Sequence, residues 1–202
     1  MRFLKSLWQA GASQFKFFLV VFLGYLLQVC VMPYFRIGSV TPSILFAIIA
    51  IITVGYGKLR ALWVGCIYGI LMETMCPTIR MLNLALYPLS AGFISMFFSD
   101  KSEKRLEYER SLGKAGRNLN PYLRTLGCAA ANVLLYEIVN LVYMYLGGAV
   151  LSFASLGRPL ASIFWTTVLT LAIVLPVRRF LGFKKHKKET PPEKPLFHIG
   201  RA

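Results

Sequence analysis

The chain has 202 residues, of which 56% are hydrophobic and only 15% are charged. A soluble domain usually has about a quarter of its residues charged, so this composition argues against a soluble globular fold. The formal net charge of +15 is that of many nucleic-acid-binding proteins. The lysines and arginines lie beside the ends of apolar segments, however, which is typical of orientation in a membrane. We therefore expect membrane lipids, and no nucleic acid, among the partners.

Long apolar runs predict membrane-spanning helices. A helix of about 20 apolar residues crosses a bilayer core, whereas the strands of a membrane barrel alternate apolar and polar residues. The stretch 17–31 is apolar at nearly every position. In chain order, the predicted spans are 15–35, 42–55, 61–77, 81–98, 123–147 and 159–177. They make residues 1–181 one polytopic membrane domain, in which the second and third spans are short enough to be a half-inserted pair.

The distribution of basic residues predicts the orientation of these six spans. With a cytoplasmic N-terminus, 20 of the 23 lysines and arginines fall on the cytoplasmic side, including those of the loop 99–122 and of the tail. Arg36, Arg80 and Arg158 are the three on the outside. Cytoplasmic connections of membrane proteins carry such an excess, and one span more or fewer would scramble it. We expect both termini in the cytoplasm and a basic, disordered tail over 182–202.

Two glutamates lie within apolar segments, where an ionisable group is a candidate functional residue. The first, Glu73, shares one helix face with Ala61, Gly65 and Gly69, because these residues recur every four positions. Gly65 and Gly69 form a GxxxG pair, which allows a second helix backbone to approach closely. Glu73 is expected to face protein, either as a carboxyl that fixes helix packing or as part of a partner- or ligand-binding site.

The second glutamate, Glu137, lies beside a polar stripe on the fifth span. Cys128, Asn132, Tyr136 and Asn140 recur there every four residues. A polar stripe inside a membrane must be covered by other helices or line a cavity. The two alternatives are hydrogen bonding between helices and a path for a ligand or proton.

Sequence patterns of catalysis and of metal binding are missing. There is no GxSxG, HExxH or Walker loop, the four cysteines have no CxxC spacing, and both histidines lie in the polar tail. We therefore expect neither an enzyme nor a bound metal or cofactor. An intramembrane enzyme that uses Glu73 or Glu137 would need further polar groups to converge on them.

Four segments carry a family resemblance. MPYFRIGSVTPSILF leads into the second span, GKLRALWVGCIYGILMETM forms the glycine-spaced third, MLNLALYPLSAGF the fourth, and PVRRFL closes the last. Over residues 33–98 in particular, they resemble the rod shape-determining protein MreD family. That family typically has aspartate where this chain has Ser43 and Glu73. The first replacement removes a carboxylate, and the second keeps it at a longer reach.

The resemblance implies a non-catalytic component of the cell-elongation machinery in the cytoplasmic (inner) membrane. It also implies a six-helix bundle similar to the substrate-binding subunits of energy-coupling-factor transporters. The implied partners are an MreC-like bitopic protein, the RodA glycosyltransferase with its penicillin-binding transpeptidase, and the actin-like MreB. We expect a partner's transmembrane helix to pack against small residues of the second and third spans. The residues of this expected surface are Pro42, Ser43, Ala61, Gly65, Gly69 and Glu73.

A substrate-binding subunit of a vitamin transporter is the alternative class. The size and the six spans fit it equally well, and a polar stripe of Asn132, Tyr136, Glu137 and Asn140 would line its ligand site. Such subunits commonly have alanine-spaced motifs in the first helix for docking to the transporter. The first span here reads FFLVVFLGYLLQVCV and has no alanine.

Overall fold

The computed structural model describes residues 2–37, 40–75, 81–99, 107–109, 111–112, 120–148 and 153–183. These residues form helices and turns with no β-strand among them, which confirms the predicted all-helical class. The long helices are α1 (Arg2–Cys30), α2 (Ile44–Tyr56), α3 (Lys58–Met75), α4 (Leu82–Phe98), α6 (Pro121–Leu146) and α7 (Phe153–Phe180). A short 3-10 turn over Met32–Tyr34 follows α1.

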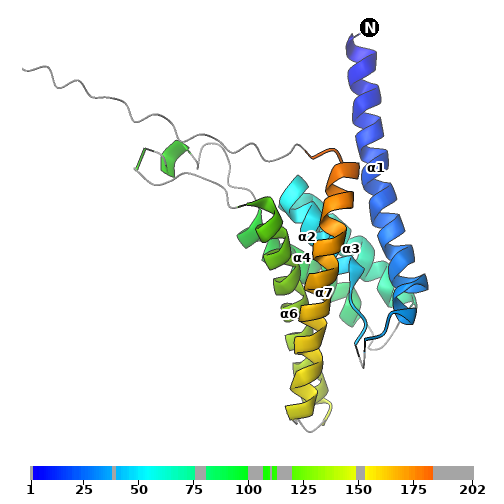
Figure 1. Ribbon diagram of the computed structural model, residues 1–202, viewed down its shortest axis with the longest axis vertical. Helices are drawn as coiled ribbons and strands as arrows, with labels where there is room; N and C mark the ends of the chain where they lie inside the picture. The colour runs from blue at the N-terminus through cyan, green and yellow to red at the C-terminus, as the bar shows by residue number, and fades with distance from the viewer. Residues whose placement is uncertain are drawn as a thin grey trace, which may run out of the picture.

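The helices pack side by side, with the beginning of α1 and the end of α7 towards the same end of the molecule (Figure 1). Contacts between side chains fix this register. The Lys16 ammonium lies 6.0 Å from the centre of the Phe180 ring, and the Arg60 guanidinium lies 5.9 Å from the ring of Phe17. We refer to this end as the basic end, and define it by Lys16, Lys58, Arg60, Arg178 and Arg179.

Helix α2 is the centre of the bundle and contacts each of the other long helices. All residues from Ile44 to Val54 are buried, as expected for a helix that is apolar on every side. Its N-terminus also lies inside the bundle. Gln28 Oε1 on α1 accepts a 2.7 Å hydrogen bond from Ile44 N–H, and Thr166 Oγ1 on α7 accepts a 3.1 Å bond from Ser43 N–H. Two neighbouring helices thus supply acceptors at a helix start, where the helix itself has none.

The link between α1 and α2 returns into the bundle without helical structure. After the 3-10 turn, Ile37 and Val40 pair as an isolated β-bridge. Val40 and Pro42 are buried. Irregular backbone at this depth is tolerated where protein covers it, which the burial provides. The second predicted span therefore begins in the interior of the bundle and not at its surface.

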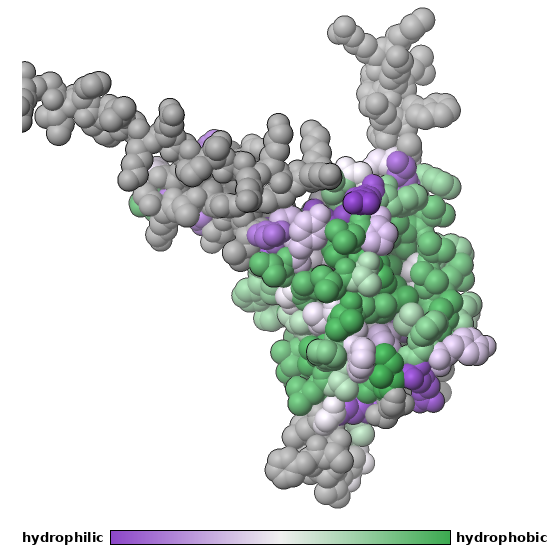
Figure 2. All heavy atoms as spheres, in the orientation of Figure 1, coloured by the Kyte–Doolittle hydropathy of each residue, from purple (hydrophilic) through white to green (hydrophobic). Residues whose placement is uncertain are grey.

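Three helical segments are long and apolar enough to cross a membrane, namely Ser13–Tyr34, Pro121–Leu146 and Gly157–Phe180. Helices α2 and α4 are apolar but shorter. Figure 2 shows an apolar band across the middle of the molecule and hydrophilic residues towards both ends. Phe18 and Phe22 are exposed on α1, whereas Thr53 and Asn132 are buried. Large exposed apolar side chains on the outer helices, with some polar side chains buried between helices, fit contact with lipid.

The helices extend beyond the predicted spans mainly at their polar ends. Helix α1 already begins at Arg2, because hydropathy marks the apolar part of a helix and not its full length. Helix α6 begins at Pro121, where Asn120 Oδ1 accepts a 3.2 Å hydrogen bond from Tyr122 N–H. The last two residues of the predicted loop 99–122 therefore belong to α6, and most of the other loop residues lie outside the described part of the chain.

The described residues at the C-terminus continue past α7. Gly182 has a φ of 76°, and Phe183 N–H donates a 3.1 Å hydrogen bond to the carbonyl of Arg178. This is the pattern of a glycine-terminated helix end. Gly182 and Phe183, the first two residues of the predicted tail over 182–202, thus form a turn at the end of α7, and 184–202 lie outside the described residues.

Candidate functional site

The small-residue face of α3 lies directly against α4. A Cβ atom on Gly65 would lie 2.9 Å from the carbonyl oxygen of Tyr87 and 3.0 Å from the Cα atom of Pro88. A Cβ atom on Gly69 would lie 3.0 Å from the carbonyl oxygen of Asn83. At Gly65 the Cβ atom would also lie 2.8 Å from the Cβ atom of Ala91, so this position needs glycine, whereas at Gly69 it would make only a tight contact with the backbone of α4. The close helix approach that the GxxxG pair predicts therefore occurs within this chain.

In this structure α4 occupies the α3 face on which a partner's helix was predicted to dock. Ala61, one turn before Gly65, is fully buried as well. At the start of α2, Pro42 is buried, and the backbone N–H of Ser43 donates to a side chain of α7. In this structure these residues contact other helices of the same chain. A separate partner would have to bind elsewhere.

Glu73 connects the end of α3 to the start of α4. Its Oε1 atom accepts a 2.6 Å hydrogen bond from the backbone N–H of Met81, which is the N-cap residue of α4 and has a φ of 62°. A carboxylate beside the first N–H groups of a helix interacts favourably with the helix dipole. The buried Oε2 atom has no hydrogen-bond partner among the described residues. The carboxyl thus fixes helix packing, which is the first of the two roles considered for it.

The polar stripe of α6 meets α2 and α4 in one cluster. The Tyr136 hydroxyl donates a 3.2 Å hydrogen bond to Asn83 Oδ1 on α4. The Tyr136 ring lies 5.3 Å from the ring of Phe46 on α2 and 5.8 Å from that of Tyr87, and the Phe46 and Tyr87 rings stack at 4.9 Å. We refer to these residues, together with Asn132 one helical turn away, as the polar layer. Three helices therefore contribute to it.

Asn132 is the most enclosed member of the polar layer. Its side chain is fully buried, and its Nδ2 atom donates a 2.8 Å hydrogen bond to the carbonyl of Cys128. Its Oδ1 atom has no hydrogen-bond partner among the described residues. A buried amide oxygen of this kind is an acceptor for a donor from a ligand or another helix.

The other two residues of the predicted stripe are placed differently. Glu137 and Asn140 are half-buried further along α6, and no hydrogen bond among the described residues joins either of them to the polar layer. The structure thus brings Asn132 and Tyr136 together with α2 and α4 but leaves Glu137 and Asn140 apart. Within the described residues, no three His, Cys, Asp or Glu side chains form a group that could hold a metal ion.

Two important polar residues escaped the sequence-based prediction. Gln28 and Thr166 provide the acceptors at the start of α2. The available signal was a single amide in an otherwise apolar first span, since a polar side chain at that depth normally has a partner. The sequence does not indicate that both residues serve the same helix end, because they lie far apart along the chain.

Removing the Tyr136 hydroxyl is expected to destabilise the polar layer. Tyr136→Phe keeps the ring contacts but leaves Asn83 Oδ1 without this donor, a loss of about 1 kcal/mol. Thermal unfolding of the purified protein in detergent measures the effect. Tyr143→Phe on the same helix is the matched control, because Tyr143 is exposed. Equal melting temperatures for the two variants would show that the hydrogen bond does not contribute to stability.

No family model, curated protein or solved structure matches the chain. The assignment of a function therefore depends on the motif segments and on the contacts described above.

Proposed function

We propose that the chain is a non-catalytic, MreD-like membrane component of the bacterial cell-elongation machinery. The observation that carries the proposal is the place of the motif residues in the bundle. Gly65 and Gly69 set the contact of α3 with α4, Glu73 accepts from the start of α4, and the turn at Ser43 is held by α7. The segments that resemble MreD are thus the ones that assemble the core of the fold. Motif residues that hold helices together fit a scaffold without an active site.

In this proposal the bundle crosses the cytoplasmic membrane six times, with both termini in the cytoplasm. Support comes from the arrangement of charge. Basic residues of α1, α3 and α7 share the basic end, as the positive-inside rule requires of a cytoplasmic face. An MreC-like bitopic protein would pack against the lipid-facing surface of the bundle. The RodA and penicillin-binding protein pair would bind in the membrane as well, and MreB would bind on the cytoplasmic side.

Depletion of the protein in a rod-shaped host is expected to convert rods into spheres, because elongation would lose its membrane organiser. Cell shape under the microscope is the readout. A plasmid copy of the wild-type chain should restore rods, and so should Gly157→Leu, since a Cβ atom at Gly157 meets nothing within 4 Å. Cells that stay rod-shaped after complete depletion would exclude the proposed role.

The orientation is tested by labelling a single cysteine introduced at Tyr108, an exposed position in the connection between α4 and α6. A membrane-impermeant maleimide should fail to label it in intact cells and should label it in inverted vesicles. A cysteine at Tyr34, at the other end of α1, should give the opposite pattern in a background without the native cysteines. Labelling of residue 108 from outside would rule out the six-span topology.

A substrate-binding subunit of a vitamin transporter is the second candidate function. The buried Oδ1 atom of Asn132 favours it, because this acceptor has no partner among the described residues and lies one turn from the aromatic cluster around Tyr136. A ligand that binds only the folded state must raise its melting temperature. Stabilisation by a B vitamin that disappears in Asn132→Leu would establish this function in place of the first.

A further inference from the structure

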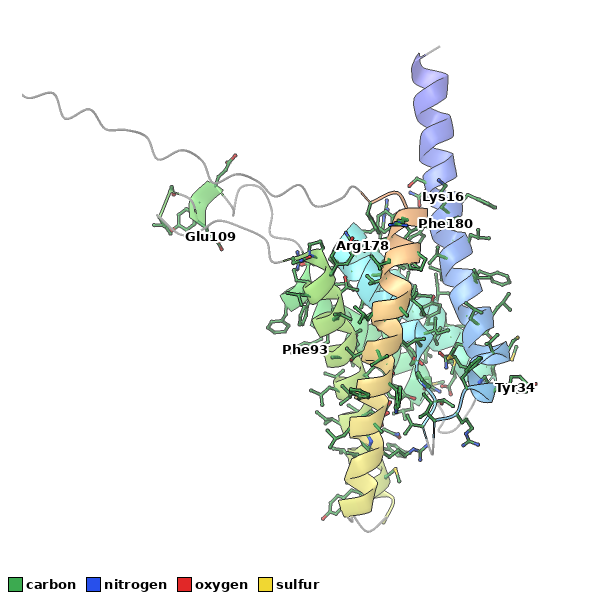
Figure 3. The ribbon with its side chains drawn as sticks, viewed as in Figure 1. Lys16, Tyr34, Phe93, Glu109, Arg178 and Phe180 are labelled. Carbon is green, nitrogen blue, oxygen red and sulfur yellow. The ribbon has the colours of Figure 1, made fainter. Side chains whose placement is uncertain are left out.

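The basic end is built on a chain of aromatic rings. The Arg60 guanidinium lies 4.5 Å from the ring of Tyr56. The Tyr56 ring lies 4.9 Å from that of Phe183, and the Arg178 guanidinium lies 5.2 Å from Phe183 and 5.4 Å from Tyr122. Figure 3 shows Lys16, Arg178 and Phe180 together at this end. Cations and rings from five helices therefore alternate around one end of the bundle.

At Arg60, the ring contacts hold the side chain in place without neutralising it. A guanidinium that stacks on a ring uses its flat face, and the N–H groups along its edge stay available for an anion. A ring contact also restricts the long side chain, so less rotational freedom is lost when an anion binds. Arg60 is half-buried between Tyr56 and Phe17 in this way. Lys16, Lys58 and Arg179 are exposed around it.

Carboxylates are scarce near the basic end. Helices α1, α2 and α7 contain no aspartate or glutamate, and the one glutamate of α3, Glu73, lies 15 residues after Lys58. At the helical rise that separation is about 22 Å, well beyond a direct ion pair. The charge at this end is therefore mostly not balanced by carboxylates on the helices that carry it.

The position of these charges along the bundle indicates a membrane surface. Lys16 and Tyr34 are 18 positions apart along α1 and the turn after it. At the helical rise this separation is about 27 Å, which is close to the thickness of a bilayer core. Phe15 and Phe18, on either side of Lys16, are exposed and apolar. Lys16 thus lies where an apolar surface ends, at the level of lipid headgroups. If the basic residues bound an acidic protein, we would expect them on the water-exposed part of the chain, away from the apolar surface. Lys16 instead lies at the border of that surface.

We propose that the basic end binds the phosphate headgroups of anionic phospholipids in the adjoining leaflet, with Arg60 as the central contact and Lys16, Lys58 and Arg179 around it. The inference rests on the membrane insertion in the proposed function but not on the role in cell shape.

The test uses the full chain, purified in a neutral detergent, and its melting temperature as the readout. Phosphatidylglycerol is expected to raise the melting temperature in a saturable way, and phosphatidylcholine is not, because a ligand of the folded state stabilises it. Each basic side chain removed should weaken the apparent affinity about fivefold. Arg60→Gln tests the stacked arginine. The double variant Lys58→Gln with Arg179→Gln removes two exposed charges that do not stack on a ring. It tests the proposal even if Arg60→Gln does not fold.

Arg158→Gln is the control, because Arg158 is an exposed arginine at the opposite end of α7. It should leave the response to phosphatidylglycerol unchanged. Inorganic phosphate at the same phosphate concentration should not reproduce the stabilisation, and if it does, a free anion is the ligand and the lipid proposal fails. Equal stabilisation by both lipids, no response to phosphatidylglycerol, or an equal loss in Arg158→Gln would also overturn it. Rod-shaped cells after depletion would contradict the proposed function while leaving this result unaffected.

Discussion

Gly65→Leu is expected to lower the stability of the bundle by about 3 kcal/mol, at the upper end of the usual cost of overpacking. The new Cβ atom would meet the Tyr87 carbonyl oxygen at 2.9 Å and the Pro88 Cα atom at 3.0 Å. These are backbone atoms of a helix, so no rotamer change relieves the contact, and the rest of the leucine needs still more space. Helices α3 and α4 would have to separate. A lower melting temperature in detergent and reduced abundance in the membrane are the measurements.

A control variant shows whether the loss of stability in Gly65→Leu comes from the contact with α4 or from any leucine placed on a helix. Gly157→Leu places the same side chain on α7, where a Cβ atom meets nothing within 4 Å, and it should melt like the wild type. A second comparison uses Ala91, whose Cβ atom lies 2.8 Å from the built Cβ of Gly65. Ala91→Gly should rescue Gly65→Ala only in part, because the backbone contacts remain. Wild-type stability of Gly65→Leu would mean that α3 and α4 do not pack as described.

Gln28→Leu is expected to destabilise the protein by about 1–3 kcal/mol. Leucine fills a similar volume but offers no acceptor, so the N–H of Ile44 loses its 2.7 Å hydrogen bond in surroundings where neither water nor the helix itself replaces it. Thr166→Val removes the acceptor for Ser43 N–H and should cost a similar amount. Equilibrium unfolding in a mixed micelle with increasing denaturing detergent provides the free energies.

The matched control for Gln28 is Gln14→Leu on the same helix. Gln14 is exposed, so its replacement should change the free energy of unfolding by no more than about 0.5 kcal/mol. If both glutamine variants lose the same amount, the effect belongs to the composition of α1 and not to the start of α2. If neither loses stability, the hydrogen bond to Ile44 contributes nothing.

The helices and the apolar part of each helix were predictable from the sequence because both follow from local residue patterns. The predicted fourth span, 81–98, differs from α4 by one residue at its start, since a turn precedes it and a polar segment follows. The predicted second span, 42–55, begins two residues before α2, but the sequence did not show how the start of this helix is held. Hydropathy places a segment in the membrane, but it does not distinguish a helix start at the surface from one that is buried and capped by other helices.

For the candidate site too, local patterns were predictable from the sequence and contacts between helices were not. The four-residue spacing of Gly65 and Gly69 predicted a close helix neighbour, and that neighbour exists. Spacing along one helix contains no information about which helix approaches, so a partner protein was expected where α4 lies. The polar stripe with Tyr136 was predicted either to be covered by other helices or to line a cavity, and the Tyr136 hydroxyl reaches Asn83 on α4. Contacts between distant parts of the chain decide such pairings, and these appear only in three dimensions.

The acceptor for Ser43 comes from Thr166, 123 residues later in the chain. During synthesis the beginning of α2 is therefore made long before the helix that completes it. Until α7 has been made, the backbone N–H of Ser43 lacks this acceptor. Completion of the α2 start thus depends on the last helix, and a chain that stops before α7 would leave it incomplete.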